Sequence, residues 1–429
     1  MELSKLKLKN FFGTTTTSKL RLKVNPREAK VGVVGVGYVG QALVQALVST
    51  GFQTYGFDVD RNKLLSVNHK LFTGAVDIKI SENCDVICVC VPTPLGKNRK
   101  PDLNFLTQAV SDVANLQSRE QLVIVESTVA PGTLRNVVLP IFEGRGKKCG
   151  RDFYLAISPE RVDPGNTLFA VKNIPRVVGG IDEMSTRLAA EFYSNFINEV
   201  VPTSSAEAAE LTKMLENTFR LVNISLVNEI KNYADAAGID IWEVIDAAAT
   251  KPYAFMPHYP GPGVGGHCIP VDPVYLVEEA KSKGVSLGIV ESALAVNEAQ
   301  PKKIVQEAKR ALNGRPNGKK AKMLLVGIAY KPGSCDTRES PALKIWEEAE
   351  RQGFSVSYFD PNVPKLNGHT SKLMDYETLL QQDVVVIATD HQNAPYEMLA
   401  DLDKPIIDCR NIMKKLARNN LLKIDKHLV

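Results

Sequence analysis

The sequence predicts an α/β protein in which two doubly wound, parallel-sheet domains are joined by a central helical region. A strand–turn–helix–strand unit opens the first domain, long helical patterns begin near residue 204, and a second alternation of strands and helices follows a polar linker. We expect four segments: a flexible N-terminal extension at 1–28, a first sheet domain at 29–203, a central helical region at 204–313 and a second sheet domain at 314–429.

Composition excludes several classes of protein. The 429 residues are 44% hydrophobic and 23% charged, with 52 basic against 48 acidic residues and a net charge of +4. This balance argues against a nucleic-acid or membrane-surface partner. We find no apolar run long enough to span a membrane, and no convincing signal peptide. The seven scattered cysteines favour a reducing, cytoplasmic location, and their spacing predicts no metal site.

The first strand–turn–helix–strand unit carries the pattern G-x-G-x-x-G between apolar runs at 29–34 and 52–57, with Asp58 after the second run. In this context the glycines predict a Rossmann-type dinucleotide site, because they permit a tight turn, approach of a pyrophosphate and close helix packing. The Asp58 carboxylate would bind ribose hydroxyls and repel a 2′-phosphate, which favours NAD over NADP. The expected cofactor residues are Gly35, Gly37, Tyr38, Val39, Gly40, Asp58 and Lys63, although Lys63 is equally typical of a solvated surface position.

Three more predicted strands, at 85–94, 121–129 and 152–160, end in polar or turn residues. Ligands of doubly wound sheets bind at the carboxyl ends of the strands. We therefore expect Thr93, Thr128 and Glu160 to line one crevice, although a threonine at a strand end is also a common helix cap.

Two further pairs of polar residues are candidates for ligand binding. Lys213 and Asn217 are four residues apart on a long, mainly apolar helical pattern, so they share one face and need a ligand or each other. Lys331 and Arg338 follow a strand of the second sheet domain, where they suit a phosphorylated ligand or are solvated loop charges.

The segment GPGVGGHCIPVDP at 261–273 places one cysteine, Cys268, among glycines and prolines that exclude regular helix. Glycines allow tight turns and would leave room for a substrate beside the sulfur. A thiolate beside a nicotinamide predicts oxidation of an aldehyde, since addition of the cysteine gives a thiohemiacetal that can lose hydride and become a thioester.

Six motifs together resemble the UDP-glucose/GDP-mannose dehydrogenase family. They are GVGYVG, ESTVAPGT, SPERVDPGN, ELTKMLENTFRLVN, GPGVGGHCIPVDP and AYKPGSCDTRESPAL, and they occur in order over residues 30 to 415. The resemblance implies two Rossmann-like domains, a central region that forms a homodimer or higher homo-oligomer, and oxidation of a nucleotide sugar at C6 to a uronic acid with two NAD. It also implies a product used for surface polysaccharide.

The resemblance implies a role for each matched residue. Cys268 would be the nucleophile, Lys213 and Asn217 would stabilise oxyanions, and Asp272 would act through water on the alcohol proton. Glu160 would position substrate and assist thioester hydrolysis, and Thr128 would hold a catalytic water. Cofactor contacts would include Thr93, Thr128 and Arg338, and the implied substrate contacts are Glu160, Arg161, Lys213, Asn217, Gly265, Gly266 and Lys331.

The loop variant GVGGHC is similar to that of family members that oxidise UDP-N-acetylhexosamines, with UDP-GlcNAc the first expectation and UDP-ManNAc or UDP-glucose the alternatives. The chain departs from the glucose branch in three places. Residues 251–259 lack an arginine, Pro164 replaces a glutamate, and Cys335 stands where acidic residues are common.

Two other functions are compatible with parts of the pattern. A β-hydroxyacid dehydrogenase shares the first domain and a Lys-x-x-x-Asn helix, but it lacks the cysteine loop and the second sheet domain. A non-catalytic nucleotide-sugar sensor would keep the fold, although all six polar groups that the chemistry needs are present.

Overall fold

The computed structural model describes residues 23–26, 28–161, 171–312 and 320–418. They form two compact units. Unit 1 contains the described residues up to Glu216 together with Val274–Gly284, and unit 2 contains Asn217–Pro273 and the described residues from Val285 onward. The boundary divides the central region expected at 204–313, so the four-segment division stays a prediction. Most of the extension expected at 1–28 lies outside the described residues, as does Pro164.

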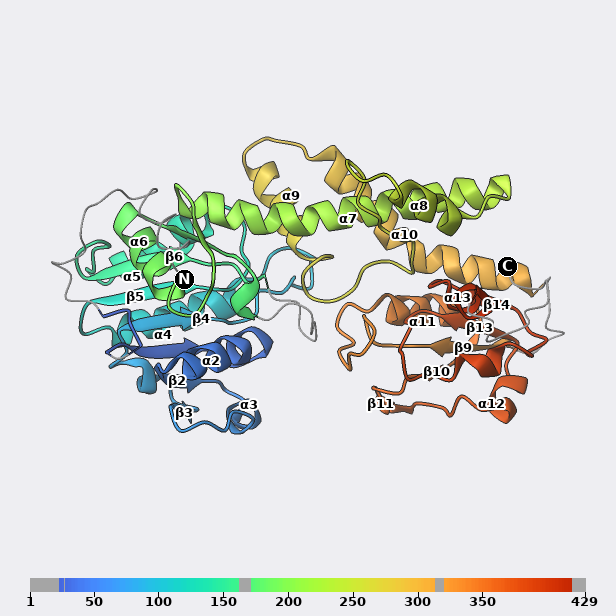
Figure 1. Ribbon diagram of the computed structural model, residues 1–429, viewed down its shortest axis with the longest axis horizontal. Helices are drawn as coiled ribbons and strands as arrows, with labels where there is room; N and C mark the ends of the chain where they lie inside the picture. The colour runs from blue at the N-terminus through green and yellow to red at the C-terminus, as the bar shows by residue number, and fades with distance from the viewer. Residues whose placement is uncertain (1–22, 27, 162–170, 313–319, 419–429) are drawn as a thin grey trace. The chain divides into compact units, whose positions relative to one another are not determined.

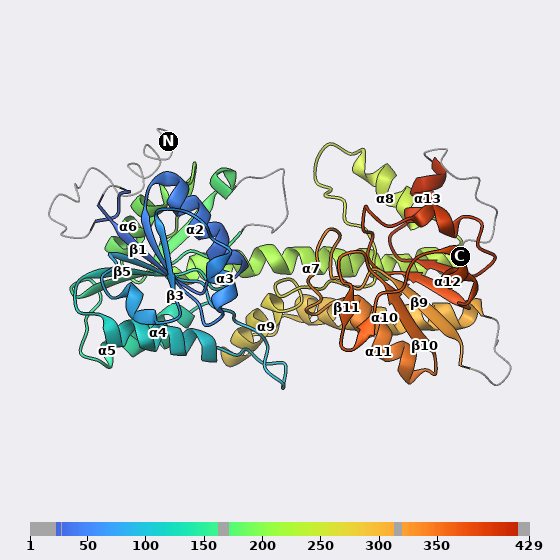
Figure 2. The same cartoon turned by 90° about the horizontal axis from the view of Figure 1, so that it is seen from below.

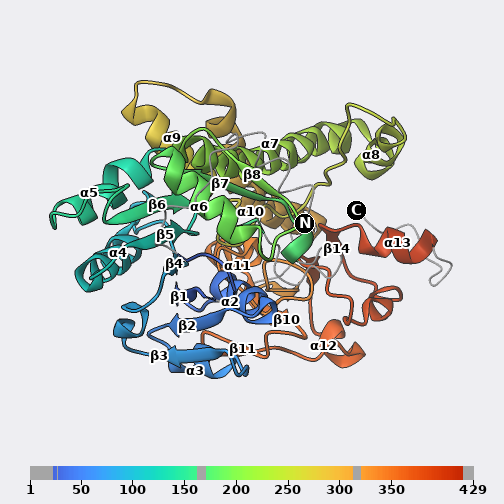
Figure 3. The same cartoon turned by 60° about the vertical axis from the view of Figure 1, so that its left-hand side comes forward.

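Unit 1 is built on an eight-stranded sheet in the order β3-β2-β1-β4-β5-β6-β7-β8 (Figures 1 and 3). All neighbours pair in parallel except β6 and β7, which are antiparallel. The strands are β1 Lys30–Val34, β2 Gln53–Phe57, β3 Phe72–Ala75, β4 Val86–Val89, β5 Gln121–Val125, β6 Phe153–Ile157, β7 Arg176–Gly180 and β8 Val200–Pro202.

Helices cover both faces of this sheet, as a doubly wound fold requires. Residues of α2 and α6 pack on one face, and residues of α4 and α5 pack on the other. Side chains of β1 alternate between the two cores, Val33 in one and Val34 in the other. The helices are α2 Tyr38–Thr50, α3 Arg61–Leu65, η1 Ile78–Ser81, α4 Asn104–Leu116, η2 Leu134–Val138, α5 Leu139–Glu143, η3 Val171–Asn173, α6 Glu183–Tyr193 and α9 Asp272–Ser282, of which α9 begins in unit 2.

Unit 2 carries a smaller parallel sheet in the order β10-β9-β13-β14 (Figure 1), of which Figure 2 labels β9 and β10. Residues of α10 and α11 pack on one face, and residues of α12 and α13 on the other. The elements are α8 Ile241–Ala249, α10 Gly288–Ala311, β9 Lys322–Val326, α11 Pro341–Arg351, β10 Ser355–Phe359, β11 Lys365–Leu366, β12 His369–Thr370, α12 Tyr376–Leu380, β13 Val384–Ile387, η4 Tyr396–Leu399, β14 Ile406–Asp408 and α13 Ile412–Arg418.

One helix, α7 at Ala206–Ala237, begins in unit 1 and continues into unit 2. It starts directly after two serines, and the Ser205 hydroxyl accepts a hydrogen bond from the Ala208 amide at 3.2 Å, as an N-cap residue does. It ends before Gly238, whose φ of 69° is the left-handed conformation typical of a helix C-terminus. The long helix predicted from the sequence is therefore confirmed.

Candidate active site

The glycine turn of unit 1 has the shape of a dinucleotide site. Gly35 has φ of 92°, and a Cβ at this position would lie 2.7 Å from the Cys90 carbonyl oxygen. A Cβ at Gly40 would lie 2.0 Å from the Gly35 carbonyl oxygen, so only glycine lets α2 begin this close to β1. A Cβ at Gly37 would meet open space, so packing within the protein does not explain a glycine there. A glycine at this position would instead let a pyrophosphate approach the N-terminus of α2.

Asp58 follows β2 and closes the same turn. Its carboxylate is buried and accepts hydrogen bonds from the Val36 amide at 2.9 Å and the Asp60 amide at 2.9 Å. The ammonium of Lys63 lies 3.3 Å from the same carboxylate, which pairs the two predicted cofactor residues with each other. Each carboxylate oxygen has two acceptor positions, and the two backbone amides leave one on each oxygen, where Lys63 donates. The predicted neighbours Tyr38 and Val39 are exposed and half-buried.

The ends of β4 and β5 are joined by a side chain that the sequence singled out. The Thr93 hydroxyl donates to the Thr128 carbonyl at 2.7 Å, and the Ser127 hydroxyl donates to the Val91 carbonyl at 2.6 Å. The two strand ends therefore lie together, as the doubly wound topology predicted.

Glu160, just beyond β6, is held by a buried group that sequence reasoning missed. Its Oε2 lies 2.8 Å from the Arg176 guanidinium, and its Oε1 accepts from the Arg161 amide at 2.7 Å. Arg176 also pairs with Glu126. The Arg161 side chain, predicted to bind substrate, donates to the Pro175 carbonyl at 2.6 Å and forms an ion pair with Glu216 at 2.7 Å.

The first turns of α7 carry Lys213 and a second buried carboxylate that the sequence did not single out. Glu210 is 1% exposed and accepts from the Gly132 amide at 2.5 Å and the Leu134 amide at 2.8 Å. It thereby ties the turn after Thr128 to α7. Lys213 is half-buried, and among the described residues of unit 1 its ammonium has no ion-pair partner.

Unit 2 brings together Asn217 and Asp272, 55 residues apart. Both side chains are buried, and the Asn217 amide donates to the Asp272 carboxylate at 2.5 Å. Asp272 begins α9, and its backbone amide donates to the carbonyl of the half-buried Cys268 at 2.8 Å. The candidate nucleophile thus lies in the turn that precedes α9, four residues before the first residue of the helix.

Five of the other six cysteines are poorly suited to nucleophilic attack because burial raises their pKa, and the sixth, Cys335, is exposed. Burial raises the pKa of the Cys84, Cys88 and Cys409 thiols to about 12, so they stay protonated at neutral pH. Cys88 lies in β4, which is wholly buried. Among the described residues no cluster of histidine, cysteine or carboxylate side chains is suited to a metal.

The glycines before Cys268 pack against the loop that follows β9. The Gly266 amide donates to the Arg338 carbonyl at 3.1 Å. A Cβ at Gly265 would lie 2.7 Å from the Glu339 carbonyl oxygen, and one at Gly266 would lie 2.8 Å from the Tyr330 ring. Close packing therefore requires glycine at both positions, whatever their contact with a substrate.

Two asparagines that the sequence analysis did not identify hold the earlier part of the cysteine segment. Asn228 on α7 accepts from the Gly261 amide at 2.9 Å, and Asn297 on α10 accepts from the Val264 amide at 2.8 Å. Both asparagines are buried, so these bonds are shielded from water. Their signal in the sequence was an amide on an apolar helix, the same signal that marked Asn217.

The loop after β9 presents the two cations that were predicted to bind phosphate or NAD. The Lys331 ammonium lies 5.7 Å from the centre of the Tyr330 ring. The exposed guanidinium of Arg338 forms an ion pair with Asp336 at 2.6 Å. The Gly333 amide donates to His391 at 3.3 Å, which joins this loop to the end of β13.

Asp360 and His391 are a buried pair beneath that loop, and His391 Nε2 lies 3.0 Å from the Asp360 carboxylate. Asp360 also accepts from the Ile328 amide at 2.7 Å and the Ala329 amide at 3.0 Å. Burial acts to raise the pKa of Asp360, but these hydrogen bonds outweigh it and lower the pKa below its ordinary value. Sequence reasoning missed this pair, because its members follow different strands.

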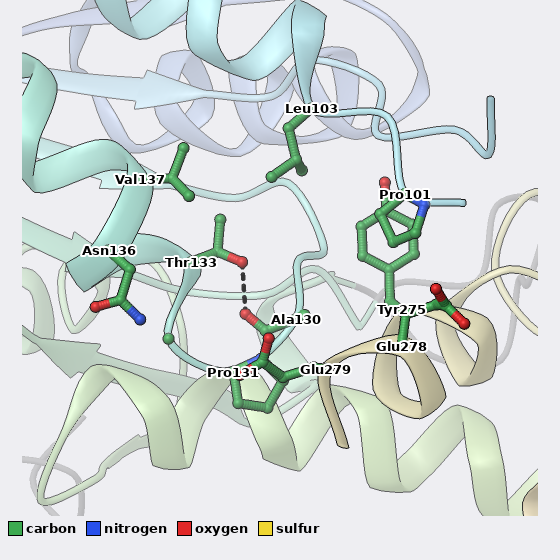
Figure 4. A pocket seen from close by; sticks show the side chains of 11 residues that line it. Pro101, Leu103, Ala130, Pro131, Thr133, Asn136, Val137, Tyr275, Glu278 and Glu279 are labelled. Atoms are coloured by element: carbon green, nitrogen blue, oxygen red, sulfur yellow. Dashed lines mark hydrogen bonds between the residues drawn. The ribbon is translucent and has the colours of Figure 1, made fainter. Parts of the chain in front are cut away.

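A cavity of about 240 Å³ lies in unit 1 between the turn after β5 and α9 (Figure 4). The Thr133 hydroxyl closes that turn by donating to the Ala130 carbonyl at 2.7 Å. Tyr275 of α9 lines the cavity and donates to the Pro94 carbonyl at 3.0 Å, next to Thr93. None of the site residues predicted from the sequence lines this cavity.

The fold and the glycine turn define a class of protein, a dinucleotide-binding protein with two doubly wound units. Family models of the UDP-glucose/GDP-mannose dehydrogenase family match in three parts: its NAD binding domain at residues 67–197, its central domain at 207–299 and its UDP binding domain at 324–415.

Similar proteins agree with these matches. UDP-N-acetyl-D-mannosamine dehydrogenase of Pyrococcus horikoshii is 33% identical over 90% of this chain and 96% of its own. UDP-N-acetyl-D-glucosamine 6-dehydrogenase of Pseudomonas aeruginosa is 33% identical over 79% of this chain and 84% of its own. A solved structure of the UDP-D-ManNAc dehydrogenase from Pyrococcus horikoshii superposes with a TM-score of 0.80 at 32% identity, covering 89% of this chain and 96% of that one.

The chain belongs to the UDP-glucose/GDP-mannose dehydrogenase family, as an NAD-dependent UDP-sugar 6-dehydrogenase. The family and the cofactor predicted from the six motifs are therefore confirmed. The matched NAD binding domain begins at residue 67, so the assignment of NAD to the glycine turn at residues 35–40 stays a prediction that rests on the geometry of that turn. No described helix is long and apolar enough to cross a membrane.

Proposed function

We propose that the chain oxidises the C6 alcohol of a UDP-N-acetylhexosamine to the uronic acid, with Cys268 as the nucleophile. The observation that carries the proposal is the arrangement around Asp272. Its backbone amide binds the Cys268 carbonyl, and its carboxylate binds Asn217, one helical turn after Lys213. A thiol, an amide, a carboxylate and an ammonium are the groups that this oxidation needs.

NAD held by the glycine turn would supply the oxidising power for two successive two-electron steps. In the first, Asp272 accepts the alcohol proton through water. The Cys268 thiolate then adds to the aldehyde carbon, and Lys213 with Asn217 stabilises the resulting oxyanion. The second oxidation leaves a thioester on Cys268. Water releases it as the carboxylate, with Glu160 and Thr128 of unit 1 orienting that water.

The N-acetylhexosamine is UDP-ManNAc or UDP-GlcNAc. The loop before Cys268 favoured UDP-GlcNAc, whereas several similar proteins aligned over about 90% of this chain are named for UDP-ManNAc. A similarly identical relative is named for UDP-GlcNAc. We place UDP-ManNAc first, because those alignments cover more of the chain. Use of the product for surface polysaccharide and the cytoplasmic location stay predictions.

The test is a stoichiometric assay. Purified protein with excess NAD receives a limiting amount of UDP-ManNAc, UDP-GlcNAc, UDP-GalNAc or UDP-glucose, and NADH is counted per sugar consumed. Two NADH from an N-acetylhexosamine support the proposal and identify the sugar. Two NADH from UDP-glucose alone would replace the substrate but keep the chemistry. One NADH per sugar would contradict the thioester route, and none with any sugar would favour a sensor.

A further inference from the structure

Behind Glu160 lies a buried charge network that the proposed chemistry does not yet use. Arg176, the first residue of β7, is 4% exposed. Its guanidinium donates to Glu160 at 2.8 Å, to the Ser158 hydroxyl at 3.0 Å and to Glu126. One cation therefore holds two carboxylates from the ends of different strands, β5 and β6.

The antiparallel pairing in the sheet of unit 1 explains this placement. Ala156 of β6 pairs with Gly180 of β7, and Ile157 pairs with Gly179. Continuing the same register sets Glu160 opposite Arg176, and cross-strand neighbours of opposite charge attract. A parallel β7 would have placed Arg176 at the opposite end of the strand from Glu160.

Glu126 and Tyr193 in turn hold the side chain of Arg176 in place. The Tyr193 hydroxyl donates to Glu126, and Arg176 lies 5.0 Å from the centre of the Tyr193 ring. Burial raises the pKa of Tyr193 well above its ordinary value, so the phenol keeps the proton that it donates. Glu126 is 1% exposed, and it compensates the guanidinium charge that Glu160 alone would otherwise have to balance.

We propose that Arg176 is a positioning residue for thioester hydrolysis, holding the Glu160 carboxylate in one orientation, and that Glu126 and Tyr193 hold Arg176. The proposal rests on the proposed function. In this step the water oxygen bonds to the thioester carbon, and the carbon–sulfur bond breaks with its electron pair leaving on Cys268. One water proton passes to Glu160 and then to solvent. With Oε2 on Arg176 and Oε1 on a backbone amide, the Glu160 carboxylate is held in one orientation.

The experiment follows NADH in a rapid-mixing instrument, using the full chain, saturating NAD and whichever UDP-sugar the wild type oxidises. Arg176→Lys keeps the charge but loses the fork that spans two carboxylates. We expect hydrolysis to slow about 10- to 100-fold while the two oxidations change little. The variant should then give a burst of two NADH per site followed by slow turnover.

Three further variants separate positioning from general damage. Arg187→Lys makes the same change at another buried arginine of unit 1, which pairs with Glu183 at 3.0 Å, and should give no burst. In a Glu160→Gln background, Arg176→Lys should slow hydrolysis no further, because coupled residues are not additive. Tyr193→Phe, which removes one hydroxyl and no charge, should slow hydrolysis about 3- to 10-fold.

The outcomes distinguish the two proposals. If the wild type oxidises none of the sugars, the proposed function fails and the role of Arg176 fails with it. If the wild type forms two NADH but Arg176→Lys matches Arg187→Lys, the role of Arg176 alone is overturned. Additive slowing in the Glu160→Gln background would also overturn it. If Arg176→Lys does not fold, Tyr193→Phe decides, and unchanged hydrolysis in that variant contradicts the proposal.

Discussion

At the scale of single residues, the structure distinguishes buried cysteines from accessible ones. Cys84 and Cys88 are buried in the cores of unit 1 and Cys409 in a core of unit 2, where their raised pKa values keep the thiols protonated. Cys268 is half-buried, ahead of the N-terminus of α9. Local environment thus sets which thiol can become a nucleophile, although all seven are chemically alike.

The Cys268→Ser variant should lose net acid formation by about 10³-fold or more, because a serine hydroxyl is a far weaker nucleophile at neutral pH. NAD binding should be retained, since the glycine turn belongs to unit 1. Uronic acid detected by mass spectrometry, together with fluorescence titration of NAD, checks both expectations. Cys335→Ser is the matched control at an exposed thiol and should keep wild-type activity. Full activity of Cys268→Ser would rule out the thioester.

The sequence is most informative where a function has a local pattern. The glycines at 35 and 40 follow a rule of spacing, and at both positions an added Cβ would lie too close to the backbone. Arg176 and Glu126 were missed because they meet across 50 residues, and neither lies in a pattern of its own. What makes them informative is burial and strand register, which a single sequence does not display.

At the scale of elements, side-chain hydrogen bonds join the helices to the turns and segments that contain the candidate site residues. Glu210 of α7 caps the turn after β5, Asn217 of α7 binds the first residue of α9, and Asn297 of α10 holds the cysteine segment. The residues predicted to be catalytic therefore stand on elements that are anchored close to each of them. Such anchoring keeps functional groups in one geometry.

The carboxylate of Glu210 should give this anchoring a measurable pH dependence. Burial raises its pKa to about 8, although the two backbone amides oppose the shift. Since the folded state holds a proton that the unfolded chain has released, the stability from this group falls as pH rises from about 4.5 through 8. Relative to Glu210→Gln, the wild type should lose up to about 1.4 kcal/mol per pH unit across that window.

Thermal unfolding midpoints of both proteins between pH 5 and pH 9 provide the measurement. Arg135 and Glu207 are the charged groups that act on Glu210, and they pair with each other at 2.6 Å. A hydrogen bond from Arg135 lowers the pKa of Glu207, so Glu207 does not titrate between pH 5 and pH 9. The unfolding midpoints of Glu207→Gln should therefore change with pH in parallel with those of the wild type. Parallel curves for Glu210→Gln as well would show that Glu210 does not titrate in the window.

At the scale of the whole molecule, α7 leaves one apolar face exposed along its length. Its exposed apolar side chains recur at spacings of three, four and seven residues, which places them on one face of the helix. They are Leu211, Leu215, Phe219, Leu226, Ile230 and Tyr233. A contiguous apolar stripe of this kind typically marks a protein interface.

We predict that this stripe joins two copies of the chain into a homodimer, because a two-fold contact can bury the same face of both helices. Light scattering on the eluting protein should give twice the chain mass of 47.0 kDa. Leu215→Glu combined with Leu226→Glu places charges in the middle of the stripe and should give the monomer mass. Leu373→Glu, at an exposed leucine of unit 2 that is not part of α7, should leave the dimer intact. A monomeric wild type, or a dimer that survives both stripe substitutions, would place the interface elsewhere or exclude it.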